Sequence, residues 1–106
     1  MSMDFAKLAE QAQQMQAELA RLQAEAESEL VTASAGGGMV RVTATAGGEI
    51  KQIEIEPKAI DPDDPELLAD LVTAAVNEAL RAGRSLLESK LSAVMPSGLG
   101  GLLPGM

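Results

Sequence analysis

The sequence lacks cysteine, histidine, tryptophan and tyrosine, and its single aromatic residue is Phe5. Without cysteine or histidine the chain can form no disulfide, no Cys/His metal site, no thiolate nucleophile and no imidazole general base. The near absence of aromatic residues also excludes an aromatic-cored barrel or sandwich. We therefore expect no catalytic residue, no metal and no cofactor, and we predict that the protein is not an enzyme.

The sequence also lacks the run of roughly 20 apolar residues that a membrane span requires. Its first residues, Met1-Ser2-Met3-Asp4, have neither the basic region nor the apolar core of a signal peptide. The absence of cysteine fits the reducing cytosol. We expect a cytoplasmic protein with no membrane partner and no small-molecule substrate.

The hydrophobic residues are mostly small. They make up 46% of the 106 residues, but 18 of them are alanine and only 25 are Leu, Ile, Val or Phe. A chain of this length forms one domain, and alanine contributes little apolar area to its core. This composition favours long helices packed at close range and completed by a partner chain.

Residues 4–29 contain no glycine or proline and are dominated by good helix formers. Their larger apolar positions follow a 3-4-3-4-3-4 spacing, which is the heptad pattern of a helix–helix seam. An ordinary amphipathic helix lying on a sheet is the alternative, although its apolar face would be wider. The seam positions are Phe5, Leu8, Ala12, Met15, Leu19, Leu22 and Ala26.

Three short strands follow this helix. Residues 30–33 form a candidate strand that the glycines at 36–38 interrupt, and residues 40–45 alternate apolar and polar side chains. Gly47-Gly48 predicts a tight hairpin turn. Residues 50–56 form the third strand, with a bulge near Lys51-Gln52, and Pro57 ends it. The strands should pair as an antiparallel sheet, followed by a loop from 57 to 64.

A second long helix is predicted from Pro65 to about Val94, with Asp64 as its N-cap. Gly83 lies inside it and indicates either a close approach to another helix or a tolerated surface glycine. Residues 1–95 should form the domain, and residues 96–106 a flexible Gly/Pro-rich tail. Whether the tail leucines dock on another surface is left open.

The fold class is therefore α+β: a long helix, a three-stranded antiparallel sheet and a long helix. Each helix would be roughly 40–45 Å long, which exceeds the diameter of a compact domain of this size. Both helices should overhang the sheet, with their free ends around Phe5 and Leu91 on the same distal side. The expected shape is an arm that projects from a small β-platform.

Several segments resemble, in the same order, the YbaB/EbfC family of bacterial nucleoid-associated proteins. The resemblance covers about residues 5–95. The segments that carry it are 7–16, 38–43, Gly48, 53–57 and 68–79. It implies a tweezer-like homodimer that binds duplex DNA with little sequence preference and acts on nucleoid organisation or gene expression. It also implies a nucleoid-associated location.

The charges are segregated along the chain. The net charge is −8, and residues 1–17, 18–78 and 79–106 carry −1, −9 and +2. The pattern predicts an acidic platform and mildly basic arm tips. The alternative is that these bases are solvated helix residues that form pairs such as Arg84–Glu88. The resemblance favours the first interpretation, and the predicted DNA-binding residues are Lys7, Arg81, Arg84 and Lys90.

Three other groups could suggest a chemical site. Glu54 and Glu56 share a strand face but have no nucleophile or orienting base nearby in sequence. The glycines at 36–38 precede a strand, whereas a phosphate-binding loop opens a helix. The acids at 61–66 lack the glycine and closing glutamate of an EF-hand. A solvated strand face, a hairpin loop and a helix cap explain these groups better.

Two functions therefore compete. In the first, the arm tips of a homodimer bind DNA phosphates, with modest affinity and a steep salt dependence. In the second, a protein-interaction or chaperone-like module uses the heptad arms to hold a protein partner.

The DNA-binding function depends on a second copy. A sheet this small is marginal alone and has two open edges, so a partner chain is expected. We expect an obligate homodimer that buries the sheet and the helix turns at about 19–31 and 68–79. Charged substitution at Val42 or Ile55 should then abolish dimer and fold together.

Overall fold

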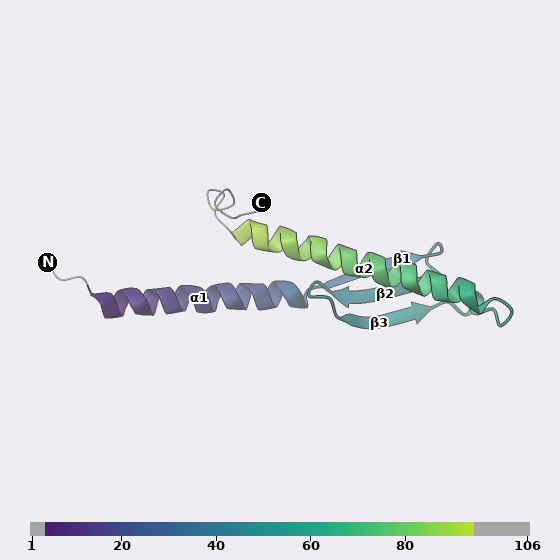
Figure 1. The fold of residues 1–106 in the computed structure, drawn as a ribbon, viewed down its shortest axis with the longest axis horizontal. Coiled ribbons are helices and arrows are strands. Elements are labelled where there is room, and N and C mark those ends of the chain that lie inside the picture. Colours follow the sequence, from purple (N-terminus) through teal and green to yellow (C-terminus); the bar gives the residue numbers. More distant parts are fainter. Residues whose placement is uncertain (1–3, 95–106) are drawn as a thin grey trace.

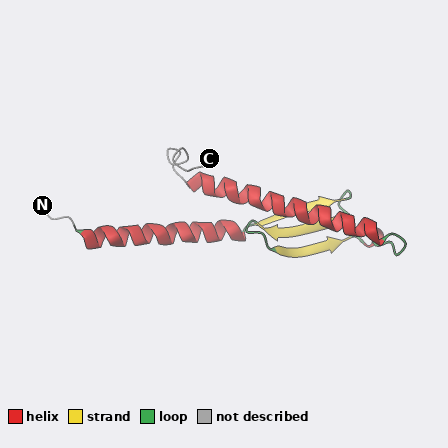
Figure 2. Ribbon diagram, in the orientation of Figure 1, coloured by secondary structure: helices red, strands yellow, loops and turns green. Residues whose placement is uncertain are grey.

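The computed structural model describes residues 4–94 and has the predicted α+β architecture (Figures 1 and 2). Helix α1 covers Phe5–Ser28, and strands β1, β2 and β3 cover Leu30–Ala35, Val40–Thr45 and Ile50–Ile55. A short 3-10 helix, η1, covers Pro57–Ala59, and helix α2 covers Pro65–Val94. The sequence-based prediction treated η1 as loop. The predicted tail at 96–106 lies outside the described residues.

The three strands form one antiparallel sheet in the order β1-β2-β3. Glycines with positive φ close both hairpins, because only glycine adopts that conformation at little cost. Gly48, at φ +99°, lies in the second hairpin. The register of β2 with β3 shifts after Thr43. Thr43 pairs with Gln52, whereas the next residue, Ala44, pairs with Ile50, so Lys51 is left as the extra residue of β3. The predicted bulge is thus confirmed.

Asp side chains cap both helices. Asp4 accepts a hydrogen bond from the backbone N–H of Lys7 at 3.1 Å, and Asp64 accepts one from Leu67 at 3.2 Å. Each bond satisfies a donor that has no partner within the helix. The predicted role of Asp64 as an N-cap is confirmed.

Helix α2 covers one face of the sheet and packs on β1 and β2. The core is small, and its two largest fully buried side chains are Val40 and Val42. Ala75 and Ala79 of α2 are fully buried against them. Small side chains at this contact let the helix axis approach the sheet closely.

Helix α1 leaves the sheet as a free arm and gives the molecule extents of 81 × 25 × 16 Å. Its residues from Phe5 to Ala20 are all exposed. The alternative of an ordinary amphipathic helix on the sheet is therefore wrong. The free ends of α1 and α2 lie on the same side of the sheet, as predicted, but α1 extends much farther than α2 (Figure 1).

Gly83 continues the line of small α2 residues formed by Ala75 and Ala79. A Cβ at Gly83 would lie 2.9 Å from the backbone oxygen of Thr45 and 3.2 Å from the Cα of Ala46. The close approach predicted for this glycine exists, but its neighbour is the end of β2 rather than another helix. Backbone atoms cannot move aside as a flexible side chain can.

Substitution of Gly83 by alanine should therefore destabilise the protein. The helix preference of alanine would contribute about 1 kcal/mol in its favour, whereas overpacking against the Thr45 backbone should cost about 1–3 kcal/mol. Urea unfolding followed by circular dichroism measures the net change. Ser85→Ala, on an exposed position of the same helix, is the control and should be neutral or mildly stabilising. An increase in stability for Gly83→Ala would contradict the close contact.

Candidate nucleic-acid interface

The four predicted DNA-binding residues are not gathered into one cluster. Lys7 lies in the first turn of α1, near the far end of the arm. About 32 Å of helix separates it from Ser28, where α1 meets the sheet. Its side chain is exposed, and among the described residues no carboxylate lies within ion-pair distance of its ammonium group.

Arg81 and Arg84 are exposed on α2, on either side of the buried position Gly83. Because Gly83 contacts the end of β2, these arginines lie at the margin of the sheet. The prediction that they belong to the distal arm tip is therefore wrong. Arg81 forms an ion pair with Glu78, one turn earlier. The Arg84–Glu88 pair that the alternative interpretation expects is absent among the described residues, so the guanidinium of Arg84 keeps its hydrogen-bond donors available to an anion.

Lys90 lies where α2 passes the C-terminal end of α1. Its Nζ is 3.1 Å from a carboxylate oxygen of Glu29, and both side chains are partly exposed. Sequence reasoning missed this partner, because Glu29 follows α1 whereas Lys90 lies on α2, and no local spacing relates them. An exposed pair of this kind is worth little in free energy, so Lys90 can exchange its carboxylate for a phosphate at small cost.

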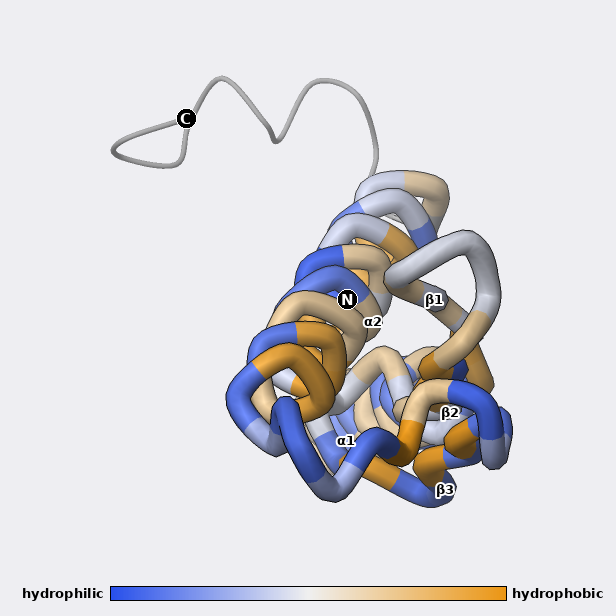
Figure 3. Tube along the Cα trace, turned by 90° about the vertical axis from the view of Figure 1, so that its right-hand side faces the viewer, coloured by the Kyte–Doolittle hydropathy of each residue, from blue (hydrophilic) through white to orange (hydrophobic). Residues whose placement is uncertain are grey.

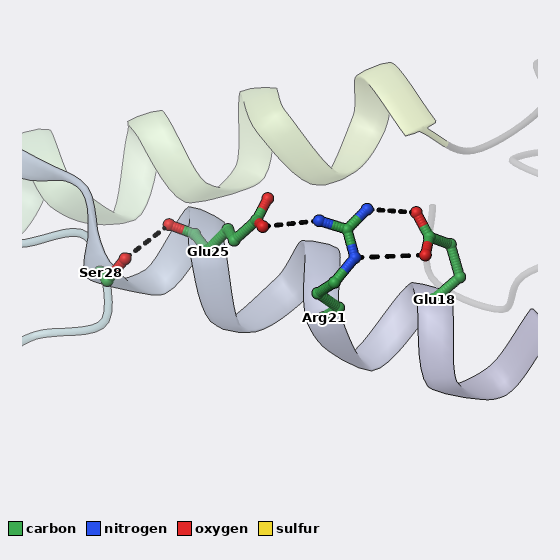
Figure 4. A network of polar contacts seen from close by, with 4 residues as sticks. All are labelled: Glu18, Arg21, Glu25 and Ser28. Atoms are coloured by element: carbon green, nitrogen blue, oxygen red, sulfur yellow. Dashed lines mark hydrogen bonds and ion pairs between the residues drawn. The ribbon is translucent and has the colours of Figure 1, made fainter.

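In the described structure, both carboxylates that pair with Arg21 lie on its own helix, α1 (Figure 4). Its guanidinium binds Glu18 through two nitrogens and Glu25 at 2.6 Å. The hydrogen bond from Arg21 lowers the pKa of the Glu18 carboxyl, and the positive charge adds to the effect. The same contacts raise the pKa of Arg21. The positive charge of Arg21 is thus paired with two carboxylates, which fits the exclusion of this residue from the predicted site.

The remaining bases lie on the platform among acids. Arg41 is opposite Glu54 in the β2–β3 pairing, and Lys51 forms an ion pair with Glu49 at 3.4 Å. Lys58 lies in η1, between Glu56 and the acids at 61–66. Residues 29–64, which comprise the sheet and the loop that follows it, hold seven acids against these three bases, so this part of the predicted platform is acidic.

The described residues offer neither a metal-binding cluster of acidic side chains nor a membrane-spanning helix. No group of three or more acidic side chains within residues 4–94 is arranged to hold a metal ion. In the same range, neither long helix is apolar enough to cross a bilayer.

The sequence is similar to known proteins along most of its length. A model of the YbaB/EbfC DNA-binding family matches residues 1–99. The chain belongs to this family. A nucleoid-associated protein of Acetivibrio thermocellus is 48% identical over 99 residues, covering 93% of this chain and 86% of the relative. Another, of Saccharopolyspora erythraea, is 45% identical over 106 residues, with 94% and 91% covered.

The fold is shared with a solved structure as well. A crystal structure of an uncharacterized protein from Helicobacter pylori superposes with a TM-score of 0.64 at 25% identity, and the match covers 83% of this chain and 92% of that one. For a YbaB/EbfC protein, DNA is the partner that the family description names. The resemblance drawn from the sequence is therefore confirmed, whereas no comparison tests the individual DNA-binding residues.

The Arg21 contacts predict a pH dependence in this YbaB/EbfC chain. Because the pKa of Glu18 is lowered in the folded state, the stabilisation from its contact with Arg21 is present above the ordinary carboxyl pKa and is lost as the pH falls through the lowered value. Arg21→Gln should raise the pKa of Glu18 towards its ordinary value, as measured by NMR titration of the side-chain carboxyl. Arg81→Gln is the control and should leave that pKa unchanged. An unchanged pKa in Arg21→Gln would refute the assignment.

Proposed function

We propose that this protein is a nucleoid-associated protein that binds duplex DNA as a homodimer, with little sequence preference, and thereby affects nucleoid organisation or gene expression. The observation that carries the proposal is the family match over residues 1–99, together with curated relatives named nucleoid-associated proteins. The segregation of charge along the chain and the exposed bases on the helices support binding to DNA phosphates.

Binding should be directed to phosphates. Arg84 presents a guanidinium without a carboxylate partner in the described structure, and Arg81 and Lys90 hold theirs only through exposed pairs. Phosphate contacts position a protein on DNA without reading its sequence. The described surface carries a single aromatic side chain for stacking on bases, Phe5, so base recognition has little chemistry to use. We propose Lys7, Arg81, Arg84 and Lys90 as the contacts.

The platform should oppose DNA binding. Residues 18–78 carry a net charge of −9, whereas the later part of α2 is positive. Repulsion between the platform and DNA would confine contact to the α2 bases and to Lys7 near the free end of α1. With few bases per chain, affinity should be modest and should fall steeply with salt, by about 0.9 log units per log unit of salt for each neutralised phosphate.

A charge-matched pair of triple variants tests this assignment. In the first, Arg81, Arg84 and Lys90 are all replaced by glutamine; in the second, Arg41, Lys51 and Lys58 are replaced in the same way. Both lose the same charge, and glutamine keeps most of the side-chain length and helix propensity. Fluorescence anisotropy on random duplex DNA should show weaker binding and a shallower salt slope only for the first variant, by about 0.9 for each lost contact.

Two outcomes would overturn the assignment. Equal loss in both variants would mean that net charge, not the α2 bases, governs binding. Absence of wild-type binding at low salt would instead favour the protein-interaction or chaperone-like function, for which the exposed apolar positions of α1 offer a surface.

The homodimer is supported by an apolar face that α2 leaves uncovered. Ile53 and Ile55 lie opposite Val42 and Val40 in the β2–β3 register, so all four share the face on which α2 packs. The valines are fully buried, whereas Ile53 is 41% and Ile55 37% exposed. In the end-on view of Figure 3, β3 forms the edge of the sheet. A second copy that covers this edge would bury both isoleucines.

Part of the expected interface is already covered within one chain. The α2 segment 68–79 is predicted to be buried by a second copy, but its Ala75 and Ala79 are fully buried in the single chain. Val42 is buried in the same way, so a charge there would unfold the monomer whether or not a dimer exists. Ile53 is the more informative position, because its exposed side chain tests the interface with less damage to the core.

Ile53→Glu should therefore weaken the dimer. Burying a carboxylate at an apolar interface is costly, so light scattering should give the mass of a single chain, or unfolded material if the dimer is obligate. Gln52→Glu is the matched control, because it places the same charge on the opposite face of β3, and it should stay dimeric. A wild-type protein that is folded and monomeric at micromolar concentration would refute the homodimer.

A further inference from the structure

The apolar stripe of α1 is buried only at its sheet-proximal end. Ala26 is 7% exposed, whereas Leu19 is 50%, Met15 67%, Leu8 47% and Phe5 72% exposed. The stripe keeps heptad spacing along its whole length, so its two ends should have the same kind of cover. An apolar stripe left in water over four turns of helix is costly.

Helix α2 supplies the cover at the buried end and then stops. Leu22 and Ala26 of α1 and Leu91 of α2 line a hollow of about 180 Å³ between the two helices, and the Lys90–Glu29 pair borders it. Helix α2 ends at Val94, while α1 continues for several more turns (Figure 1). The uncovered part of the stripe begins where α2 runs out.

The chain that follows α2 has the length and composition to continue this cover. Residues 95–106 contain no charged side chain, and their apolar members are Met95, Leu99, Leu102, Leu103 and Met106. Twelve residues in extended form reach roughly 36–40 Å. The distance along α1 from Leu19 to Phe5 is about 21 Å, so the segment can run the full length of the stripe.

Charge favours this segment over a second α1 helix. Residues 4–28 contain five acids and two bases, so two such helices side by side would bring a net charge of −3 against another −3. The segment 95–106 has no side-chain charge to repel. It is also tethered to the adjacent helix, which makes its local concentration high.

We propose that residues 95–106 fold back along α1 of the same chain and cover its apolar stripe from Leu19 towards Leu8. Leu99, Leu102 and Leu103 would supply the apolar contacts, and the glycines and prolines would let the segment follow the helix without being helical. The α2 seam would thus continue beyond the end of α2. Such a cover would also keep the arms of separate molecules from associating through their stripes.

Because the chain lacks cysteine, disulfide trapping can test this cleanly. In the full-length protein, Met15→Cys/Leu102→Cys places one thiol on the stripe and one in the segment. Under mild oxidation it should form a disulfide within the chain several-fold faster than Ala17→Cys/Leu102→Cys. Ala17 is exposed on the same helix two residues on, on a different face from the stripe. Non-reducing electrophoresis and peptide mass spectrometry separate linkage within a chain from linkage between chains.

Three outcomes would overturn the proposal. Equal rates for the two double variants would mean that the segment has no preference for the stripe. A disulfide between position 15 of one chain and position 102 of another would place the segment on a neighbouring molecule. Rapid linkage between two copies of the single variant Met15→Cys would mean that a second α1 covers the stripe. Circular dichroism of each reduced variant checks that the fold is intact.

Discussion

A single helix is too narrow to cover three strands, and most of the structure follows from that constraint. Helix α2 packs on β1 and β2 and fully buries Val40 and Val42. It leaves the equivalent residues of β3, Ile53 and Ile55, more than a third exposed. Neither β3 nor the arm of α1 has an intramolecular cover in the described structure. The incomplete core is thus a physical reason to expect a second copy at the sheet edge.

The narrow contact is made possible by small residues at regular intervals on α2. Ala75, Ala79 and Gly83 follow one another every four residues, and this spacing places them on one face of the helix. All three are buried against the sheet. Their small size brings the backbone of α2 close to β2, and it also fixes where the exposed arginines beside Gly83 emerge. The position of Arg81 and Arg84 is therefore a consequence of core packing.

Local patterns predicted the elements well, because their causes are local. Heptad spacing, glycine turns, the Asp64 cap and the Lys51 bulge all appear within a few residues of the features they predict. Relations between distant segments could not be predicted in this way. The Lys90–Glu29 pair, the contact of Gly83 with Thr45 and the sheet-margin position of Arg81 depend on how α2 crosses the sheet. The assumption that both helices end at a common tip failed for the same reason, since α1 extends well beyond α2.

The pattern of ion pairs also bears on where an anion can approach. On α1, the one arginine lies between two glutamates of its own helix and is bound to both. On α2, Arg81 pairs with the carboxylate of Glu78, and Lys90 pairs with that of Glu29, which lies outside α2. Exposed pairs are weak, so what distinguishes these bases is the number of carboxylates that a phosphate must displace. A phosphate would have to displace two carboxylates at Arg21 and one each at Arg81 and Lys90. At Arg84 it would displace none within the described residues. Arg84 is therefore the α2 base at which an approaching phosphate would displace the fewest carboxylates, and Arg21 is the arm base at which it would displace the most.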